Sequence, residues 1–154
     1  MELRVEDVLV RKVITIDSEC TVKEATELLA RHSTSSLVVL TGNAISGILT
    51  TRDIVSRVVS EGLNPESIPV KDVMTSPVIM MRTDTPLGEA IKVMLQRKIK
   101  KLPIFEGERD NARLVGMISL TDMIEYHPDI FSDLWTRVLM TVPGMAEQGE
   151  IHVA

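Results

Sequence analysis

Short apolar runs and longer apolar stripes alternate along the chain, and the whole pattern occurs twice. The runs at residues 13–16 and 78–81 have the length of strands, whereas residues 22–29 and 87–95 place apolar side chains on one face of a helix. Apolar runs at residues 37–40 and 102–105 predict further strands. Gly42-Asn43 predicts a tight hairpin into a strand over residues 44–49, and the second copy is expected to reach a strand over residues 114–119. With a closing helix, each copy predicts the order strand, helix, strand, strand, helix.

The amino-acid sequence itself repeats, which indicates a duplication. Val5-Glu6-Asp7-Val8 returns 65 residues later as Val70-Lys71-Asp72-Val73, and the spacing becomes 69 after the charged segment 106–111. That segment is expected to be a solvated loop, with a lid over a ligand as the alternative. A unit of about 60 residues buries little surface alone, so two units are expected to share one core. We therefore predict an α/β (α+β) module of two βαββα repeats, residues 1–64 and 65–127, related by a pseudo-twofold axis.

Residues 128–154 are predicted to form a C-terminal helix and a tail. Pro128 precedes an amphipathic stripe, and Pro143-Gly144 is expected to end it. The stripe consists of Ile130, Phe131, Leu134, Trp135, Val138 and Leu139. We expect it to pack on its own module or on the second copy in a homodimer, with a docking face for another protein as the alternative. Residues after Gly144 are expected to be loosely held.

The composition excludes several classes of function. Of the 154 residues 44% are hydrophobic, and the formal net charge of −5 disfavours nucleic acid as the main partner. One Trp, one Tyr and two Phe also offer few surfaces for stacking bases. The only cysteine, Cys20, cannot form an intrachain disulfide and is expected to be a half-buried small hydrophobe. With no export signal and no apolar stretch long enough for a membrane, we expect a cytoplasmic protein.

Motifs for catalysis or metal binding are not found in the sequence. His32, His127 and His152 lack the spacing of metal ligands and are expected at the surface. No phosphate-binding loop, nucleophile elbow or HExxH motif occurs. The methionines at positions 74, 80, 81, 94, 117 and 123 are expected to form adaptable core. We therefore expect no enzyme activity, no metal site and no covalent cofactor.

A doubled signature is the most informative feature of the sequence. Residues 47–53, GILTTRD, recur as residues 116–122, GMISLTD, each at the end of a predicted strand and the start of a helix. Over residues from about 5 to 126, this signature and the element order resemble tandem pairs of the cystathionine-β-synthase (CBS) domain family, called Bateman modules. The resemblance implies a stand-alone regulatory module that binds AMP, ADP, ATP or another adenosyl compound, such as S-adenosylmethionine, between its repeats. It also implies a homodimer and a regulated enzyme or transporter as partner.

The residue types of the signature suit a nucleotide. The carboxylates of Asp53 and Asp122 can accept hydrogen bonds from both hydroxyls of a ribose, and Thr50 or Ser119 can donate to a phosphate beside the helix start. The alternative is a capping box, in which hydroxyl and carboxylate satisfy backbone donors at a helix start. A carboxylate that is fully engaged in this way cannot also hold a ribose.

The resemblance implies two clefts, each combining the signature of one repeat with the first strand of the other and the loop before its second strand. The first cleft is expected to contain Val13, Ile14, Thr15, Thr34, Ser35, Ser36, Leu37, Ser119, Thr121 and Asp122. The second cleft is expected to contain Thr50, Arg52, Asp53, Val78, Ile79, Met80, Lys98, Lys100, Lys101, Leu102 and Pro103.

Charge is expected to separate the two clefts. The basic run 97–101 belongs to the second cleft, so we expect this cleft to prefer phosphates and to bind AMP, ADP or ATP more tightly. A solvated end of the preceding helix is the alternative explanation for the run. The first cleft has neutral hydroxyl residues at the matching place and is expected to take a less charged ligand or none.

Two other functions remain open at this point. The aspartates could merely cap helices in a constitutive homodimerisation or scaffolding module, or the chain could resemble the accessory domain of a dehydrogenase or kinase. A ligand that raises the melting temperature as its concentration increases distinguishes a sensor from a scaffold.

Overall fold

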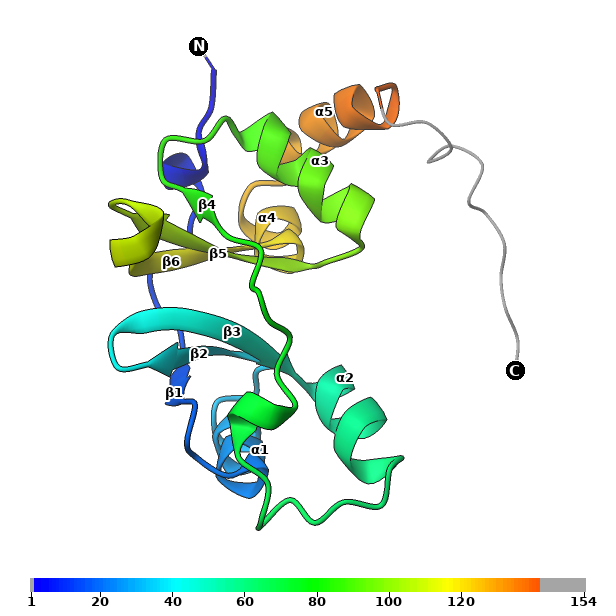
Figure 1. The fold of residues 1–154 in the computed structure, drawn as a ribbon. Coiled ribbons are helices and arrows are strands. Elements are labelled where there is room, and N and C mark those ends of the chain that lie inside the picture. Colours follow the sequence, from blue (N-terminus) through cyan, green and yellow to red (C-terminus); the bar gives the residue numbers. More distant parts are fainter. Residues whose placement is uncertain (1, 142–154) are drawn as a thin grey trace, which may run out of the picture.

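The computed structural model describes residues 2–141, which form two three-stranded sheets with their helices, one above the other in Figure 1. The first repeat contains β1 (Thr15–Asp17), α1 (Val22–Arg31), β2 (Ser36–Thr41), β3 (Ala44–Thr50) and α2 (Thr51–Ile54), which continues as the π-helical turn η2 (Val55–Val59). The second repeat contains β4 (Met81–Arg82), α3 (Leu87–Arg97), β5 (Lys101–Glu106), β6 (Arg113–Ser119) and α4 (Leu120–Tyr126). The predicted α/β architecture of two βαββα repeats is confirmed.

The two sheets have the same topology. In each, the first strand runs parallel to the second, which pairs with the third in an antiparallel hairpin. The predicted hairpin at Gly42-Asn43 is present, and Gly42 adopts a φ of +61° that glycine tolerates well. The charged segment of the second hairpin contains a short 3-10 turn, η4 (Arg109–Asn111).

The first strand of each repeat begins later than the apolar run predicts, at Thr15 and at Met81. The residues before these strands leave their own sheet and approach the other one. Val10 forms an isolated bridge with Met117, and Thr75 forms one with Ile48. We call residues 10–14 and 75–80 the crossing segments.

Local signals explain where the first helices begin and end. The Thr21 hydroxyl accepts a hydrogen bond from the backbone N–H of Glu24 at 3.2 Å, and Pro86 precedes α3. Both helices are followed by a residue in the left-handed conformation, Ser33 with φ of 49° and Lys98 with φ of 56°. This sharp turn directs each chain into the strand that follows.

Two apolar cores are present, one in each repeat, so the expectation of a single shared core is wrong. Each core is completed by a 3-10 turn that precedes the other repeat in sequence: η1 (Val5–Asp7) and η3 (Val70–Asp72). Val5 packs in the second core, and Val70 packs in the first. The division into residues 1–64 and 65–127 therefore stays a prediction from the sequence, because each core contains residues from both ranges.

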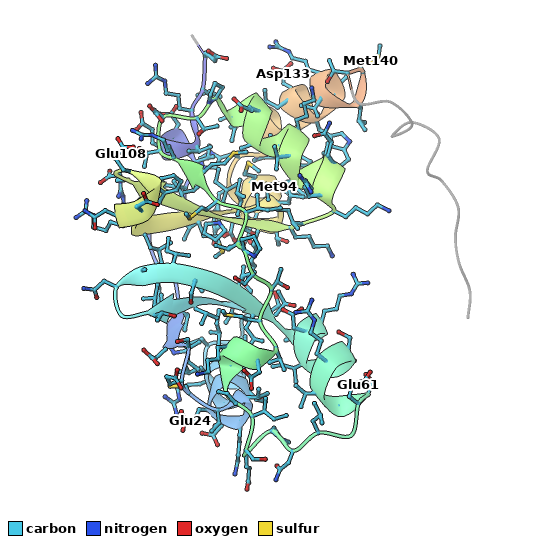
Figure 2. The ribbon with its side chains drawn as sticks, in the orientation of Figure 1. Glu24, Glu61, Met94, Glu108, Asp133 and Met140 are labelled. Carbon is cyan, nitrogen blue, oxygen red and sulfur yellow. The ribbon has the colours of Figure 1, made fainter. Side chains whose placement is uncertain are left out.

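Most of the predicted adaptable methionines contribute to this packing. Met94, Met117 and Met123 are buried, and Met94 belongs to the second core. The acidic residues Glu24, Glu108 and Asp133 lie on the outside of the molecule (Figure 2).

The predicted C-terminal helix is α5 (Pro128–Leu139), which lies beside α3 and α4 (Figure 1). Val138 is buried in the second core, and the rings of Phe131 and Trp135 stack with centroids 5.2 Å apart. The stripe therefore packs on its own module. The expected stop at Pro143-Gly144 and the tail lie outside the described residues. Within residues 2–141 no helix has the length and apolar character needed to cross a membrane.

Candidate functional site

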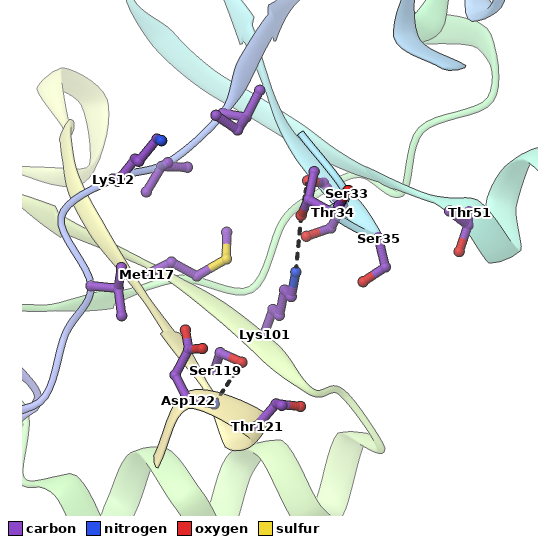
Figure 3. A pocket seen from close by; sticks show the side chains of 14 residues that line it. Lys12, Ser33, Thr34, Ser35, Thr51, Lys101, Met117, Ser119, Thr121 and Asp122 are labelled. Atoms are coloured by element: carbon purple, nitrogen blue, oxygen red, sulfur yellow. Dashed lines mark hydrogen bonds between the residues drawn. The ribbon is translucent and has the colours of Figure 1, made fainter. Parts of the chain in front are cut away.

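A cavity of about 550 Å³ opens between the two repeats (Figure 3). It is lined by Val10, Lys12, Val13, Ile14, Ser33, Thr34, Ser35, Ser36, Thr51, Lys101, Met117, Ser119, Thr121 and Asp122. The structure thus brings together most of the residues expected in the first cleft. Two do not line it: Leu37 is fully buried in the first core, and Thr15 borders a separate cavity.

Three chain segments supply most of the lining of this cavity, and Thr51 and Lys101 complete it. The strand β6 ends at Ser119 and α4 begins at the next residue, so the signature side chains lie at a strand-helix junction. From the first repeat, the turn after α1 leads into residues 33–36, and the backbone N–H of Thr51 donates to the carbonyl of Ser35 at 3.0 Å. The first crossing segment supplies the apolar wall. The hydroxyl-rich loop and the aspartate therefore face each other across the boundary between the repeats.

Asp122 has a half-buried carboxylate that faces this cavity. Its backbone N–H donates to the Ser119 hydroxyl at 3.4 Å, but the reciprocal bond of a capping box is not formed. Among residues 2–141, no hydrogen bond or ion pair involves its carboxylate oxygens. Both oxygens can therefore accept hydrogen bonds from a ligand, and the Ser119 hydroxyl retains its own donor.

Asp53, at the equivalent position of the first repeat, is engaged by the protein itself. Its Oδ2 accepts from the Thr50 N–H at 3.0 Å, and its N–H donates to the Thr50 Oγ1 at 3.1 Å, which completes a capping box. The Thr75 hydroxyl donates to Oδ1 at 3.3 Å, and Arg57 Nη1 lies 3.9 Å from the same oxygen. Only 10% of the Asp53 side chain is exposed. The capping alternative therefore describes Asp53, and it leaves this carboxylate little room for a ribose.

The two aspartates differ because their neighbours differ between the repeats. Thr75, which donates to Asp53, is replaced by Val10 at the equivalent place in the first crossing segment. Arg57, which forms the ion pair with Asp53 and donates to the carbonyls of Val73 and Met74, is replaced by Tyr126. Neither replacement provides the same contact to Asp122: valine lacks a donor, and tyrosine carries no positive charge.

The residues expected in the second cleft are not gathered around a cavity in the same way. Apart from Lys101, none of them lines the inter-repeat cavity or either of two other cavities, one beside Leu63 and one beside Asn43. Arg52, Lys98 and Lys100 are exposed, and Leu102 and Pro103 are buried. This geometry does not support the expectation that the second cleft is the tighter nucleotide site.

Lys101 brings a positive charge to the first cleft, whereas the sequence analysis assigned it to the second. Its Nζ donates to the Thr34 hydroxyl at 3.3 Å, across the boundary between the repeats and inside the first cleft (Figure 3). Burial lowers the pKa of this amine, and the negative charge of Asp122 opposes the shift. Lys12 lines the same cavity. The loop over residues 33–36 is neutral as expected, but two lysines also border the first cleft, which does not support the expectation of a less charged ligand there.

Ser36 contributes a buried polar group without a partner. The residue is only 6% exposed, and its Oγ has no hydrogen-bond partner among the described residues. An unsatisfied buried hydroxyl costs about 1–3 kcal/mol, so such groups are rare in folded proteins. Ser36 belongs to the loop that lines the cavity, but its Oγ is covered by the protein.

Comparison with known proteins accounts for the repeated architecture. The profile of the CBS domain matches residues 5–60 and 70–129. The chain belongs to the CBS domain family. Tandem CBS pairs are regulatory modules.

Relatives of this CBS pair include an uncharacterised protein, MK0525, from Methanopyrus kandleri, which is 34% identical over 80% of this chain and 62% of its own length. An inosine-5'-monophosphate dehydrogenase from Korarchaeum cryptofilum is 35% identical over 81% of this chain, but only 25% of its own length is covered. The chain thus spans less than two thirds of both relatives.

Solved structures share the CBS pair fold. An uncharacterised conserved protein from Pyrococcus horikoshii matches with a TM-score of 0.72 and 26% identity, over 100% of this chain and 98% of that one. The CBS domain pair of protein MJ0100, in complex with 5'-methylthioadenosine and S-adenosyl-L-methionine, has a TM-score of 0.70 at 24% identity, over 81% of this chain and 95% of that one.

Four cavity residues of this CBS pair were missed by sequence reasoning: Val10, Lys12, Thr51 and Met117. A signal existed for two of them, because Val10 and Lys12 lie just before the predicted residues 13–14 and fall within the repeated register. Met117 and Thr51 lie inside the signature segments, where the sequence singled out other positions as ligand contacts.

The remaining polar candidates are unremarkable in position. Among residues 2–141 no group of three His, Cys, Asp or Glu side chains is arranged to hold a metal ion. His32 is exposed, His127 precedes α5, and His152 lies outside the described residues. Cys20 is half-buried, as expected, and burial raises the pKa of its thiol.

Proposed function

We propose that this CBS pair is a regulatory module, without catalytic activity, that binds an adenine nucleotide or another adenosyl compound in the first cleft. The observation that carries the proposal is the carboxylate of Asp122, which borders an inter-repeat cavity and has no partner among residues 2–141. A carboxylate can accept hydrogen bonds from both hydroxyls of a ribose. The equivalent Asp53 is engaged by Thr50 and Thr75, so we propose one site per chain.

The other groups in the cavity fit the remaining parts of an adenosyl compound. Its volume of about 550 Å³ is within the usual range of small-molecule sites. Val10, Val13, Ile14 and Met117 provide an apolar wall against which a base can lie. Ser119 and Thr121 add hydroxyl donors beside the aspartate. The complex of the structural neighbour MJ0100 with two adenosyl compounds adds weight to this ligand class.

The position of the cavity suggests how binding would regulate a partner. Its wall combines the first crossing segment and residues 33–36 with the signature of the second repeat. A ligand that contacts both repeats stabilises the arrangement of the repeats in which it fits. The size of this effect equals the difference between its binding free energies for that arrangement and for the alternatives. We propose that a cytoplasmic enzyme or transporter senses this shift.

We also propose that the module forms a homodimer. Val55 and Val59 on η2, and Ile124 and Tyr126 on α4, are large apolar or aromatic side chains with exposures between 53% and 68%. Val55 and Ile124 occupy equivalent positions of the two repeats, so the exposed apolar surface is repeated like the fold. Sedimentation equilibrium tests this proposal, and a molecular mass of one chain at every concentration contradicts it.

Isothermal titration calorimetry on matched aspartate variants tests the ligand site. We expect AMP, ADP, ATP or S-adenosylmethionine to bind with a stoichiometry of about one per chain. Asp122→Asn should weaken the binding of that ligand by about tenfold or more, because a charge-assisted pair of hydrogen bonds to the ribose is lost. Asp53→Asn should leave the affinity nearly unchanged and lower the melting temperature, because it disturbs a helix cap.

Two results would contradict the proposal in different ways. A larger loss of affinity in Asp53→Asn than in Asp122→Asn would move the site to the second cleft. If no member of the adenosyl panel gave heat or raised the melting temperature, the scaffolding alternative would replace the sensor.

A further inference from the structure

The Lys101 amine is enclosed by the cavity without a negative partner at close range. Its hydrogen-bond acceptor is the neutral hydroxyl of Thr34, at 3.3 Å. Among the side chains described, no carboxylate oxygen lies within the 4.0 Å of an ion pair with it. A partly buried ammonium group loses hydration, and only a close negative charge compensates for this loss.

The lowered pKa of the Lys101 amine agrees with this geometry. Burial is the main cause that lowers its pKa, and the opposing effect of Asp122 is smaller. If Asp122 binds a ribose, as proposed, its charge is shared with the ligand hydroxyls. The amine would then still lack a partner, which a negatively charged group of the same ligand could supply.

A further positive charge borders the cavity. Lys12 contributes a second ammonium group on another side of the cavity (Figure 3). With Lys12, Lys101 and Asp122, the charged side chains lining the cavity have a net charge of +1. Such a set favours an anion and opposes a cation.

We infer that the cavity selects adenosyl compounds that carry a phosphate over uncharged or cationic ones, and that Lys101 sets this preference. The inference rests on the proposed function and narrows its ligand class. The phosphate would accept from the amine of Lys101. The sulfonium group of S-adenosylmethionine would instead meet a cavity with a net positive charge, and adenosine would leave Lys101 with only the neutral hydroxyl of Thr34.

The neighbouring Lys100 provides a matched control. It belongs to the same basic run and is one residue away, but its side chain is exposed and does not line the cavity. A general attraction of nucleotides to basic surface would respond to both lysines. A site effect responds to Lys101 alone.

The test is calorimetric titration of the full chain with AMP, adenosine and S-adenosylmethionine. We expect AMP to bind at least about tenfold more tightly than either of the others, since hydrogen bonds to charged groups are the strong ones. Lys101→Met should lower the AMP affinity by about tenfold and change the adenosine affinity by less than about threefold, while Lys100→Met changes neither. Lys101→Gln keeps a polar end but removes the charge, and it should lower the AMP affinity as well. The melting temperatures of both variants check that the loss of affinity does not come from misfolding.

The outcomes separate this inference from the proposed function. If adenosine or S-adenosylmethionine binds as tightly as AMP, or if Lys101→Met weakens all three ligands equally, the phosphate preference is overturned and the adenosyl site stands. If neither these three compounds nor ADP and ATP bind, the proposed function and the inference both fail.

Discussion

The side chain of Lys101 connects the electrostatics of one residue to ligand binding. Burial lowers the pKa of this amine below its ordinary value of 10.5. A bound phosphate would raise the pKa again, because a negative charge favours the protonated amine. The complex then holds the proton more tightly than the free protein does. By linkage, the affinity for AMP must decrease as pH rises through the lowered pKa of the free protein.

We predict that calorimetry from about pH 7 to about pH 10 will show a decreasing AMP affinity toward the alkaline end. Lys101→Arg, which stays charged throughout, should remove most of this decrease. The stability of the free protein changes in the opposite sense: the unfolded lysine keeps its proton to higher pH than the folded one, so this residue's contribution to stability increases through that window. Identical pH profiles for the wild type and the arginine variant would argue against a role for Lys101 in binding.

The sequence predicted the local geometry of the signature residues well, but not their electrostatic surroundings. A strand that ends at Ser119 and a helix that begins next to it place Asp122 one turn later, and this depends only on adjacent residues. Lys101 was assigned to the wrong side because it pairs with Ser119 across the β5–β6 hairpin. Cross-strand partners share a face of the sheet, and this register is not visible in the linear order of the basic run.

At the scale of elements, the signature glycines allow the crossing segments to approach the sheets. A Cβ on Gly116 would lie 2.7 Å from the carbonyl oxygen of Val10, and one on Gly47 would lie 2.9 Å from that of Thr75. Both distances are shorter than real Cβ contacts. The sequence shows that this glycine is repeated. It does not show why, because the crossing segment that the glycine accommodates is distant along the chain.

We predict that Gly116→Ala lowers the free energy of unfolding by about 1–3 kcal/mol, since the backbone at Val10 must move. AMP binding should weaken as well, because Val10 also lines the cavity. Gly88→Ala in α3 is the control: its Cβ would meet only Leu134 Cδ2, at 4.0 Å, and alanine favours a helix by up to about 1 kcal/mol. Urea denaturation followed by the fluorescence of Trp135 measures both. If the two variants were equally stable, the short distance between residue 116 and the Val10 carbonyl would not be what requires a glycine.

At the scale of the whole molecule, the duplication explains the two sheets but not how the repeats are joined. The segments around Val5 and Val70 were visible as a repeat in the sequence. Hydrophobic periodicity identifies elements and their buried faces, but it does not identify which core a short apolar turn enters. The structure inserts each turn into the opposite repeat, so each repeat depends on residues that precede the other.

We predict that Val5→Ala loosens the second repeat and Val70→Ala loosens the first. Both valines have an exposure of 0%, so each change should cost about 2 kcal/mol of stability. Native-state hydrogen exchange should show reduced protection of β5 and β6 in Val5→Ala and of β2 and β3 in Val70→Ala. The two variants control for each other, because the same chemical change is made at equivalent positions. If each variant instead lost protection in the repeat that follows the valine in sequence, the crossed packing would be contradicted. Saturating AMP should restore protection in both variants, because the cavity proposed to bind AMP is built from both repeats.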